Sequence, residues 1–184
     1  MNHKANLRMF LGQRRDALSR HQVVEASARI EAHILELPEI DRAESIFAYV
    51  SVGNEVATRG LIGQLLELGK VVAVPRMTAD GLMCPVLLES IEKLSPGRFG
   101  VPEPNGERLF EGVIDVCLAP GVAFTLAGAR LGRGGGHYDR FLDENQLVLA
   151  IGLAYQWQII EPWPMDEHDR PVQMIATEGG MVRM

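Results

Sequence analysis

Short apolar runs alternate with helical segments along the 184-residue chain. The runs cover residues 45–50, 71–74, 113–119 and 148–154, and each has the length of a buried strand. Because parallel strands need long crossover connections, which helices usually supply, this order predicts an α/β fold. We expect a mainly parallel sheet with helices on both faces, in a single domain that spans residues 1–184.

Apolar periodicity and capping signals mark the helices. Leu7, Phe10, Leu11 and Leu18 recur at helical spacing near the start of the chain. Four helices are expected: one over residues 3–18, a second that begins at a capping box of Ser19 and Gln22 and ends before Pro38, a third that Thr58 caps and that ends at Leu68, and a fourth over residues 137–144.

The remaining segments are expected to be short strands and connections. Residues 83–88 and 172–176 are predicted strands, and Pro75 is predicted to end the strand that precedes it. Residues 96–112 are rich in proline and glycine and predict a loop, while residues 121–136 predict a long connection that carries glycines.

Functional residues are expected at one edge of this sheet. In open parallel sheets, ligands bind beyond the carboxyl ends of the strands. The connections that follow Val50, Val74, Ala119 and Ala154 are therefore the places to seek chemistry, and the glycine-bearing connection is the third of them.

Composition narrows the function classes. The net charge is −6, which disfavours nucleic acid as a partner, and the two cysteines lack metal-ligand spacing. The first ten residues lack the apolar region of a signal peptide, and the longest apolar stretch, residues 148–155, is too short to cross a bilayer. We expect a cytoplasmic protein with no membrane or nucleic-acid partner, as a monomer or, alternatively, a homodimer.

The segment RLGRGGGHYDRF, residues 130–141, is the strongest candidate for a binding site. Backbone N–H groups of a glycine-rich turn can surround a phosphate, and a following helix adds the partial positive charge of its N-terminus. Arg130, Arg133 and Arg140 would add cations. The segment matches neither a Walker A loop nor the dinucleotide fingerprint. A plain flexible connection is the alternative.

Further charged residues could complete a phosphate and metal site. Lys4, Arg8 and Arg15 fall on one stripe of the first helix, either as a solvated face or as a partner of the glycine segment. Asp139 and Asp169 could bind Mg²⁺, although a helix-start charge and a surface turn are the alternatives.

Two more residues at strand ends are candidates. Glu55 could accept hydrogen bonds from an amino-pyrimidine edge, or it could be only a charge near a helix start. Arg76 is a possible additional phosphate contact, since it follows Pro75 at a predicted strand end.

LAPGVAFTLAGARLGRGGGHYDRFL, residues 118–142, resembles the signature of the 5-formyltetrahydrofolate cyclo-ligases, also called 5,10-methenyltetrahydrofolate synthetases. KANLRMFLGQRRDALS, FAYVSVGNEVATRGLIGQLLELGKVVAVPRM, GRFGVPEPNGE and AIGLAYQWQIIEPWPMDEHDRPVQMIATE resemble other segments of that family, in the same order. The resemblance implies an ATP- and Mg²⁺-dependent ring closure of 5-formyltetrahydrofolate to 5,10-methenyltetrahydrofolate, with release of ADP and phosphate.

The resemblance also assigns roles to residues of this chain. It implies ATP contacts at Lys4, Arg8, Arg130, Leu131, Gly132, Arg133, Gly134, Gly135, Gly136, His137 and Tyr138. It implies folate contacts at Val50, Glu55, Gly134, Gly135, Gly136 and His137, and magnesium ligands at Asp139 and Asp169.

Three positions depart from the family pattern. His137 stands where the family commonly has a first tyrosine, Thr125 where it often has aspartate, and Arg133 where an aromatic or aliphatic residue is frequent. These departures leave two alternatives open: a divergent paralogue that acts on another small molecule, and a non-catalytic nucleotide- or folate-binding protein.

Overall fold

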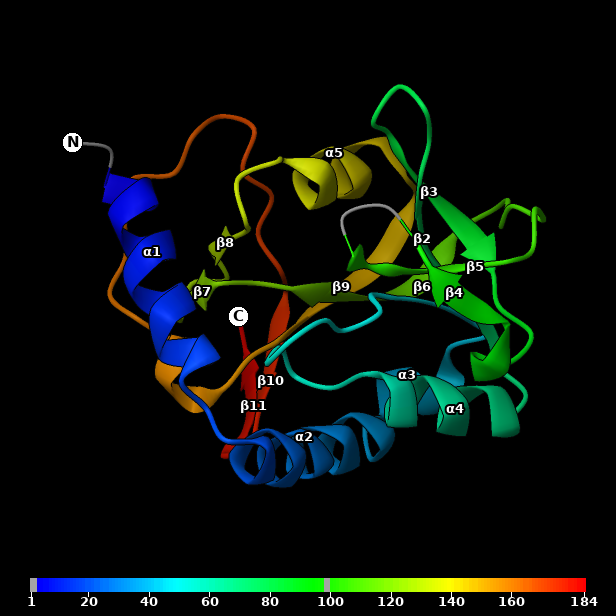
Figure 1. The fold of residues 1–184 in the computed structure, drawn as a ribbon, viewed down its shortest axis with the longest axis horizontal. Helices are drawn as coiled ribbons and strands as arrows, with labels where there is room; N and C mark the ends of the chain where they lie inside the picture. The colour runs from blue at the N-terminus through cyan, green and yellow to red at the C-terminus, as the bar shows by residue number, and fades with distance from the viewer. Residues whose placement is uncertain (1–2, 98–99) are drawn as a thin grey trace.

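A seven-stranded sheet forms the centre of the chain in the computed structural model, which describes residues 3–97 and 100–184 (Figure 1). The strand order is β11-β10-β9-β6-β1-β2-β3. Neighbours from β10 to β2 pair in parallel, and the two edge strands, β3 and β11, pair antiparallel. The strands are β1 (Ser45–Ala48), β2 (Val71–Met77), β3 (Met83–Leu87), β6 (Ile114–Pro120), β9 (Leu147–Leu153), β10 (Met174–Thr177) and β11 (Gly180–Arg183).

Helices cover both faces of this sheet. In Figure 1, α2, α3 and α4 lie below the sheet and α5 lies above it, while α1 lies at the side next to a small β7–β8 hairpin. The helices are α1 (His3–Asp16), α2 (Arg20–Leu35), α3 (Pro38–Arg42), α4 (Arg59–Glu67) and α5 (His137–Glu144), and the short turns η1 (Ile91–Lys93) and η3 (Gln156–Gln158) are 3₁₀ helices. The predicted α/β class is confirmed.

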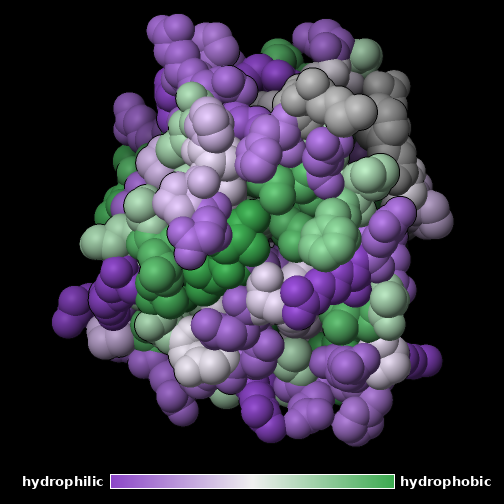
Figure 2. All heavy atoms as spheres, turned by 90° about the vertical axis from the view of Figure 1, so that its left-hand side faces the viewer, coloured by the Kyte–Doolittle hydropathy of each residue, from purple (hydrophilic) through white to green (hydrophobic). Residues whose placement is uncertain are grey.

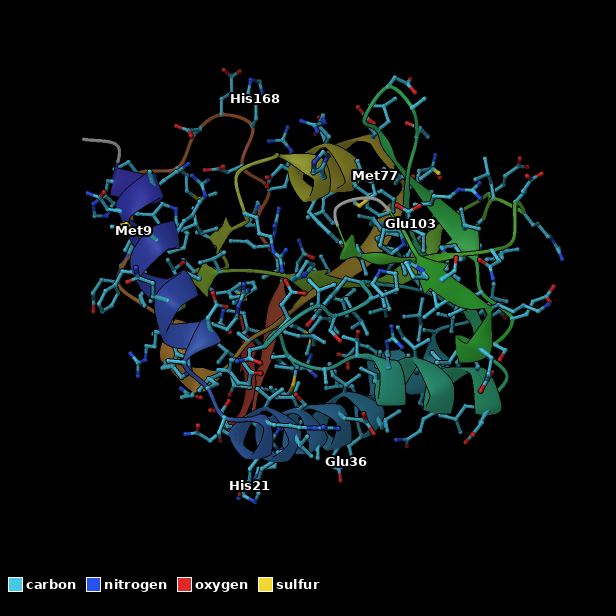
Figure 3. All side chains as sticks on the ribbon, in the orientation of Figure 1. Met9, His21, Glu36, Met77, Glu103 and His168 are labelled. Carbon is cyan, nitrogen blue, oxygen red and sulfur yellow. The ribbon has the colours of Figure 1, made fainter. Side chains whose placement is uncertain are left out.

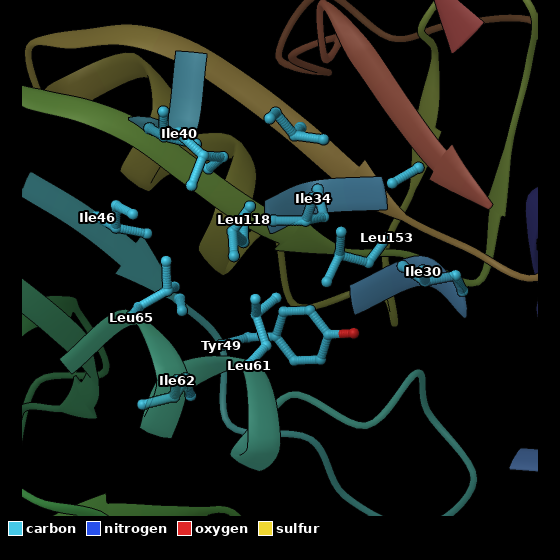
Figure 4. Close-up of a cluster of buried hydrophobic side chains, with 14 of the residues drawn as sticks. Ile30, Ile34, Ile40, Ile46, Tyr49, Leu61, Ile62, Leu65, Leu118 and Leu153 are labelled. Carbon is cyan, nitrogen blue, oxygen red and sulfur yellow. The ribbon is translucent and has the colours of Figure 1, made fainter. Parts of the chain in front are cut away.

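The larger core lies between the sheet and the α2–α4 layer. Ile30 and Ile34 from α2 pack with side chains of the other helices and of the strands, as Figure 4 shows. Each fully buried aliphatic side chain of this kind contributes about 1.5–3 kcal/mol through the hydrophobic effect. On the opposite face, the Phe47 ring of β1 stacks on the Phe141 ring of α5 at 4.1 Å between centroids. This stack fixes α5, and with it the glycine segment, residues 132–136, that precedes α5.

The N-terminal helix α1 packs on a separate, smaller cluster. Its Leu11 is buried against Trp163 and against Leu131 of β8. Met9 and Phe10 remain on the outer side of α1, with 61% and 62% of their surface exposed. Figure 2 views the molecule from the α1 side, where polar side chains surround a central group of apolar ones.

The capping box of Ser19 and Gln22 and the helix at residues 137–144 are confirmed. Pro75, by contrast, does not end its strand, because β2 runs on to Met77. The parallel pairing of β1 with β2 stops at the Phe47–Ala73 pair, and Pro75 lies opposite Pro85 of β3. Beyond the end of β1, the missing N–H of a proline costs no ladder hydrogen bond on that side.

Thr58 precedes α4 but does not cap it with its side chain. Its hydroxyl donates to the Tyr49 carbonyl at 2.7 Å and accepts from the Ser51 N–H at 3.0 Å. The side chain therefore fixes the connection that follows β1. Pro38 lies beyond the end of α2, as predicted, and it also begins α3, where a proline at the first helical position is well tolerated.

Several segment predictions were too coarse. The predicted loop 96–112 carries β5 (Pro102–Pro104), which pairs with β4 (Leu94–Pro96), and the predicted connection 121–136 contains the hairpin of β7 (Ala123–Phe124) and β8 (Arg130–Leu131). The helix and strands predicted over residues 3–18, 45–50 and 172–176 have shifted ends, and β11 was missed altogether. Short hairpins carry little periodicity, so sequence patterns rarely show them.

Within the described residues, no helix is both long enough and apolar enough to cross a membrane.

Candidate active site

The strand order reverses between β1 and β6. After β1 the chain continues through α4 to β2 on one side, and after β6 it continues through α5 to β9 on the other. A parallel sheet opens a crevice at such a switch point, beyond the carboxyl ends of its strands. Two cavities lie there.

The first cavity, here called the chamber, has a volume of about 310 Å³. Its wall is mostly apolar, formed by residues that follow β1, belong to β2, begin β3 and precede β5: Tyr49, Val50, Pro75, Met77, Met83 and Val101. The Met77 and Glu103 side chains, labelled in Figure 3, both line the chamber. The glycine segment and the start of α5, residues 135–139, form another part of the wall. A chamber of this size and polarity suits a flat organic molecule.

Glu55 supplies a carboxylate to this apolar chamber. Its Oε2 accepts from the Val52 N–H at 3.0 Å, and its Oε1 accepts from Arg133 Nη2 at 2.6 Å. Arg15 of α1 approaches the same Oε1 at 3.7 Å. The carboxylate is therefore held in a fixed orientation among apolar walls.

The second cavity, here called the charged cavity, has a volume of about 440 Å³. Its wall combines cations, carboxylates and the other side of the glycine segment. The charged lining residues are Lys4, Arg8, Arg130, Asp139, Arg140, Asp143, Asp166, His168, Asp169 and Arg170. His168, labelled in Figure 3, lies on the connection between η3 and β10 that closes this side.

Ion pairs organise the charged cavity. Lys4 Nζ donates to Asp166 at 2.7 Å and to Asp169 at 2.5 Å. Burial alone would lower the pKa of Lys4, but these two carboxylates outweigh it and the pKa is raised. Burial would likewise raise the pKa of Asp169, yet the hydrogen bonds from Lys4 and from the Asp166 N–H bring that pKa below its usual value. Both groups are charged at neutral pH.

A second pair lies at the start of α5. Arg130 Nη2 donates to Asp139 Oδ1 at 2.6 Å, and the Arg130 side chain is almost completely buried. The guanidinium carbon also lies 5.6 Å from the centroid of the Tyr138 ring. The Nε of Arg130 and the hydroxyl of Tyr138 have no hydrogen-bond partner within the structure. This cation thus keeps donor capacity beyond its contact with Asp139.

The glycine segment separates the two cavities. Gly134 has a φ of +106° and Gly136 a φ of +66°, a region that L side chains rarely adopt. A Cβ atom on Gly135 would lie 2.7 Å from the His137 imidazole. Arg8 Nε donates to the Gly132 carbonyl at 2.8 Å, which ties α1 to the segment. The missing side chains therefore allow a sharp turn between two cavities.

The structure brings most of the predicted site residues together. Lys4, Arg8, Asp139 and Asp169 all line the charged cavity, although more than 120 residues separate the first two from the last two. Val50, Glu55, Gly135, His137 and Tyr138 line the chamber. Arg130, Gly132, Gly136 and Asp139 line both cavities, while Leu131 and Gly134 line the charged cavity alone.

Some residues that the sequence analysis singled out do not line the cavity expected for them. Arg133 lines the chamber and a neighbouring groove with Arg8 and Arg15, and it does not line the charged cavity. Arg76 lines neither cavity and donates to the Gly106 carbonyl at 2.8 Å. Thr125 is buried outside both cavities, where its hydroxyl accepts from the Ala129 N–H and closes the β7–β8 turn.

Sequence reasoning missed the methionines of the chamber and several charged residues of the charged cavity, among them Asp143, Asp166 and Arg170. Met77 and Met83 face each other across β2 and β3, which only the register reveals. Asp166 and Arg170 flank Asp169 in a segment rich in charges, and that clustering was the available signal. Within residues 3–97 and 100–184, no three His, Cys, Asp or Glu side chains gather closely enough to hold a metal ion.

Comparison with known proteins agrees with this architecture. The 5-formyltetrahydrofolate cyclo-ligase family matches the chain over residues 1–178. Proteins named 5-formyltetrahydrofolate cyclo-ligase from Mus musculus and Escherichia coli are 31% and 30% identical to it, over 95% and 91% of this chain and 93% and 96% of theirs.

Two solved structures have the same fold. The 5,10-methenyltetrahydrofolate synthetase of Aquifex aeolicus superposes with a TM-score of 0.86 at 30% identity, covering 98% of this chain and 92% of that one. The corresponding protein of Mycoplasma pneumoniae gives a TM-score of 0.73 at 25% identity, covering 96% and 99%. Family, relatives and fold together show that this chain is an enzyme of the 5-formyltetrahydrofolate cyclo-ligase family.

Proposed function

We propose that this enzyme uses ATP and Mg²⁺ to close 5-formyltetrahydrofolate to 5,10-methenyltetrahydrofolate. The observation that carries the proposal is the shared wall of the two cavities. Arg130, Gly132, Gly136 and Asp139 line both the apolar chamber and the charged cavity. A flat folate in the chamber and the triphosphate of ATP in the charged cavity would meet at this shared wall. Its glycines carry no side chains, so they would leave room for the reacting groups.

The charged cavity suits the phosphates of ATP. Lys4, Arg8, Arg130 and Arg140 supply cations from two distant parts of the sequence. Backbone N–H groups in the glycine segment and the start of α5 add donors and a partial positive charge. Positioning and neutralisation of charge are what phosphoryl transfer requires of a protein.

The donor set of the charged cavity also fits Mg²⁺. Mg²⁺ usually takes one or two carboxylates and completes its shell with phosphate oxygens and water, so Asp139 and Asp169 would suffice once ATP is present. When bound, the ion would neutralise charge on the phosphate oxygens. In the structure, Arg130 and Lys4 balance these two carboxylates, so the negative charges are oriented before the ligand arrives.

The chamber suits the folate. Met77, Met83 and Val101 give an apolar surface for flat rings, and Glu55 gives a fixed acceptor for the N–H groups of the pterin. His137 lies on the same wall and begins α5, next to the proposed phosphate site. We expect the formyl group to face this end of the chamber.

The chemistry follows from the leaving group. An amide oxygen leaves poorly and a phosphate leaves well. The formyl oxygen attacks the γ-phosphorus of ATP, and the bond from that phosphorus to the bridging oxygen breaks and releases ADP. N10 then attacks the formyl carbon and gives up its proton, the carbon–oxygen bond breaks, and phosphate departs with the former formyl oxygen.

The direct test mixes purified protein with ATP, Mg²⁺ and 5-formyltetrahydrofolate and follows the methenyl chromophore together with ADP. We expect one ADP for each methenyl product, and no product when ATP or Mg²⁺ is omitted. Absence of the chromophore at high enzyme concentration would contradict the proposal. ATP binding without folate-dependent turnover would favour a divergent paralogue.

A further inference from the structure

Two arginines share the carboxylate of Glu55, and their environments differ. Both approach Oε1, Arg133 at 2.6 Å and Arg15 at 3.7 Å. The Arg15 side chain is only 13% exposed, whereas that of Arg133 is 53% exposed. Arg15 is thus a buried counterion fixed on α1, and Arg133 reaches the carboxylate from the open side of the chamber.

The backbone that carries Arg133 favours movement of its side chain away from Glu55. Arg133 lies between Gly132 and Gly134, and Gly134 adopts a φ of +106°. Its neighbours therefore place few steric limits on how its peptide units turn. Among the residues that the structure describes, Glu55 is the one hydrogen-bond partner of the Arg133 side chain. Loss of that bond frees the whole side chain.

The hydrogen bond from Arg133 to Glu55 has the same kind of donor and acceptor as the hydrogen bond expected between a pterin ring and Glu55. A guanidinium presents N–H donors in a planar fork that matches a carboxylate. The amino-pyrimidine ring of a pterin also presents coplanar N–H donors. Because Oε2 of Glu55 is engaged by the Val52 N–H, Arg133 holds the oxygen that such a ring would need.

We infer that Arg133 is a displaceable latch, which occupies the pterin acceptor of Glu55 and must leave when the folate binds. The inference rests on the proposed function, since it assumes a folate in the chamber. It makes Arg133 a competitor of the substrate at this carboxylate. Arg15, which stays in place, keeps Glu55 paired after the latch opens.

The test compares the affinity for 5-formyltetrahydrofolate, measured without ATP by titration calorimetry, in four proteins: wild type, Arg133→Leu, Glu55→Gln and the double variant. Removal of an exposed competitor of this kind should lower the Kd about fivefold in Arg133→Leu. In the Glu55→Gln background the same change should have almost no effect, because the latch then holds no carboxylate.

Arg29→Leu is the matched control. Arg29 also forms one exposed ion pair, with Glu25 on α2, and lines neither cavity. It should leave the Kd unchanged. A Kd that is unchanged or higher in Arg133→Leu would overturn the latch, and so would an equal gain in the Glu55→Gln background, which would indicate simple crowding at the mouth of the chamber. If the wild type and every variant fail to bind the folate, the proposed function itself fails.

Discussion

The chamber and the charged cavity lie at the same edge of the sheet, but they are organised by different forces. Apolar side chains at the ends of β1, β2 and β3 shape the chamber, and Glu55 gives it a carboxylate that is held in a fixed orientation. The charged cavity is lined by five cations, Lys4, Arg8, Arg130, Arg140 and Arg170, together with carboxylates that balance them. The comparison teaches that one glycine segment can form a wall of two cavities of opposite character. It also predicts that a substitution in one cavity can weaken the binding of its proposed ligand without changing the affinity for the ligand of the other cavity.

The largest effect is expected from Glu55→Gln. Glutamine keeps an oxygen for the Val52 N–H but loses the charge and presents an amide to the pterin. Hydrogen bonds to charged groups contribute about 1.5–3 kcal/mol, so the affinity for 5-formyltetrahydrofolate should fall about 100-fold. The affinity for ATP should stay within about twofold in titration calorimetry. Equal losses for both ligands would show that the cavities are not separable.

Lys4→Met should weaken the binding of ATP and leave the affinity for the folate unchanged. The variant keeps the aliphatic stem of Lys4 but leaves Asp166 and Asp169 without their shared cation, so two carboxylates would face the incoming phosphates. We expect about 20-fold weaker binding of Mg²⁺–ATP and an unchanged affinity for the folate. Lys93→Met, which removes an exposed lysine paired with Glu89 outside both cavities, is the control and should alter neither. Wild-type ATP affinity in Lys4→Met would show that Lys4 of α1 does not contribute to nucleotide binding.

Gly135→Val tests the wall between the cavities. Its Cβ would collide with the His137 imidazole, so the ring or the segment must shift, and Gly134 and Gly136 of the same segment line the charged cavity. ATP affinity should fall about tenfold, while the free energy of unfolding measured in urea should change by less than about 1 kcal/mol. Gly106→Val is the control, because a Cβ there meets nothing closer than 3.8 Å. Unchanged ATP affinity in Gly135→Val would contradict the phosphate cradle.

The smallest expected effect is on the free energy of unfolding of Asp169→Asn and its dependence on pH. The lowered pKa of Asp169 means that its ion pair with Lys4 stabilises the fold above the unfolded-state pKa, about 3.9, and that this contribution is lost as the pH falls through the folded-state pKa. Asp169→Asn should therefore cost about 1 kcal/mol at pH 7, and the difference from wild type should shrink below about pH 4. Urea unfolding at pH 7, 5 and 3 measures it. A constant difference across this range would show that charge is not the cause.

Much of the sheet and of the glycine segment could be predicted, because their signals are local. Apolar runs mark β1, β6 and β9, and the glycines with the following helix mark the turn into α5. The pairing of charges could not be predicted in the same way. Helical spacing placed Lys4 on one stripe with Arg8 and Arg15, but it did not indicate that Asp169, 165 residues away, forms an ion pair with Lys4.

The same limit applies to the chamber. Arg133 was assigned to ATP on its position in the glycine segment, yet its side chain turns to Glu55, 78 residues earlier. The methionine wall depends on the register of β2 against β3, and Pro75 gave a misleading local signal because the end of β1 relaxes the rule against prolines. Contacts between distant segments follow from packing of the whole chain, which local patterns do not contain.

The central claim is that the folate in the chamber and the γ-phosphate in the charged cavity react across the glycine segment. The most direct measurement uses 5-formyltetrahydrofolate labelled with ¹⁸O in the formyl group, with ATP, Mg²⁺ and the wild-type enzyme in unlabelled water. Mass spectrometry of the released phosphate should find one ¹⁸O in each phosphate, in equal amount to the methenyl product. Phosphate that carries only unlabelled oxygen would contradict transfer of the γ-phosphoryl group to the formyl oxygen.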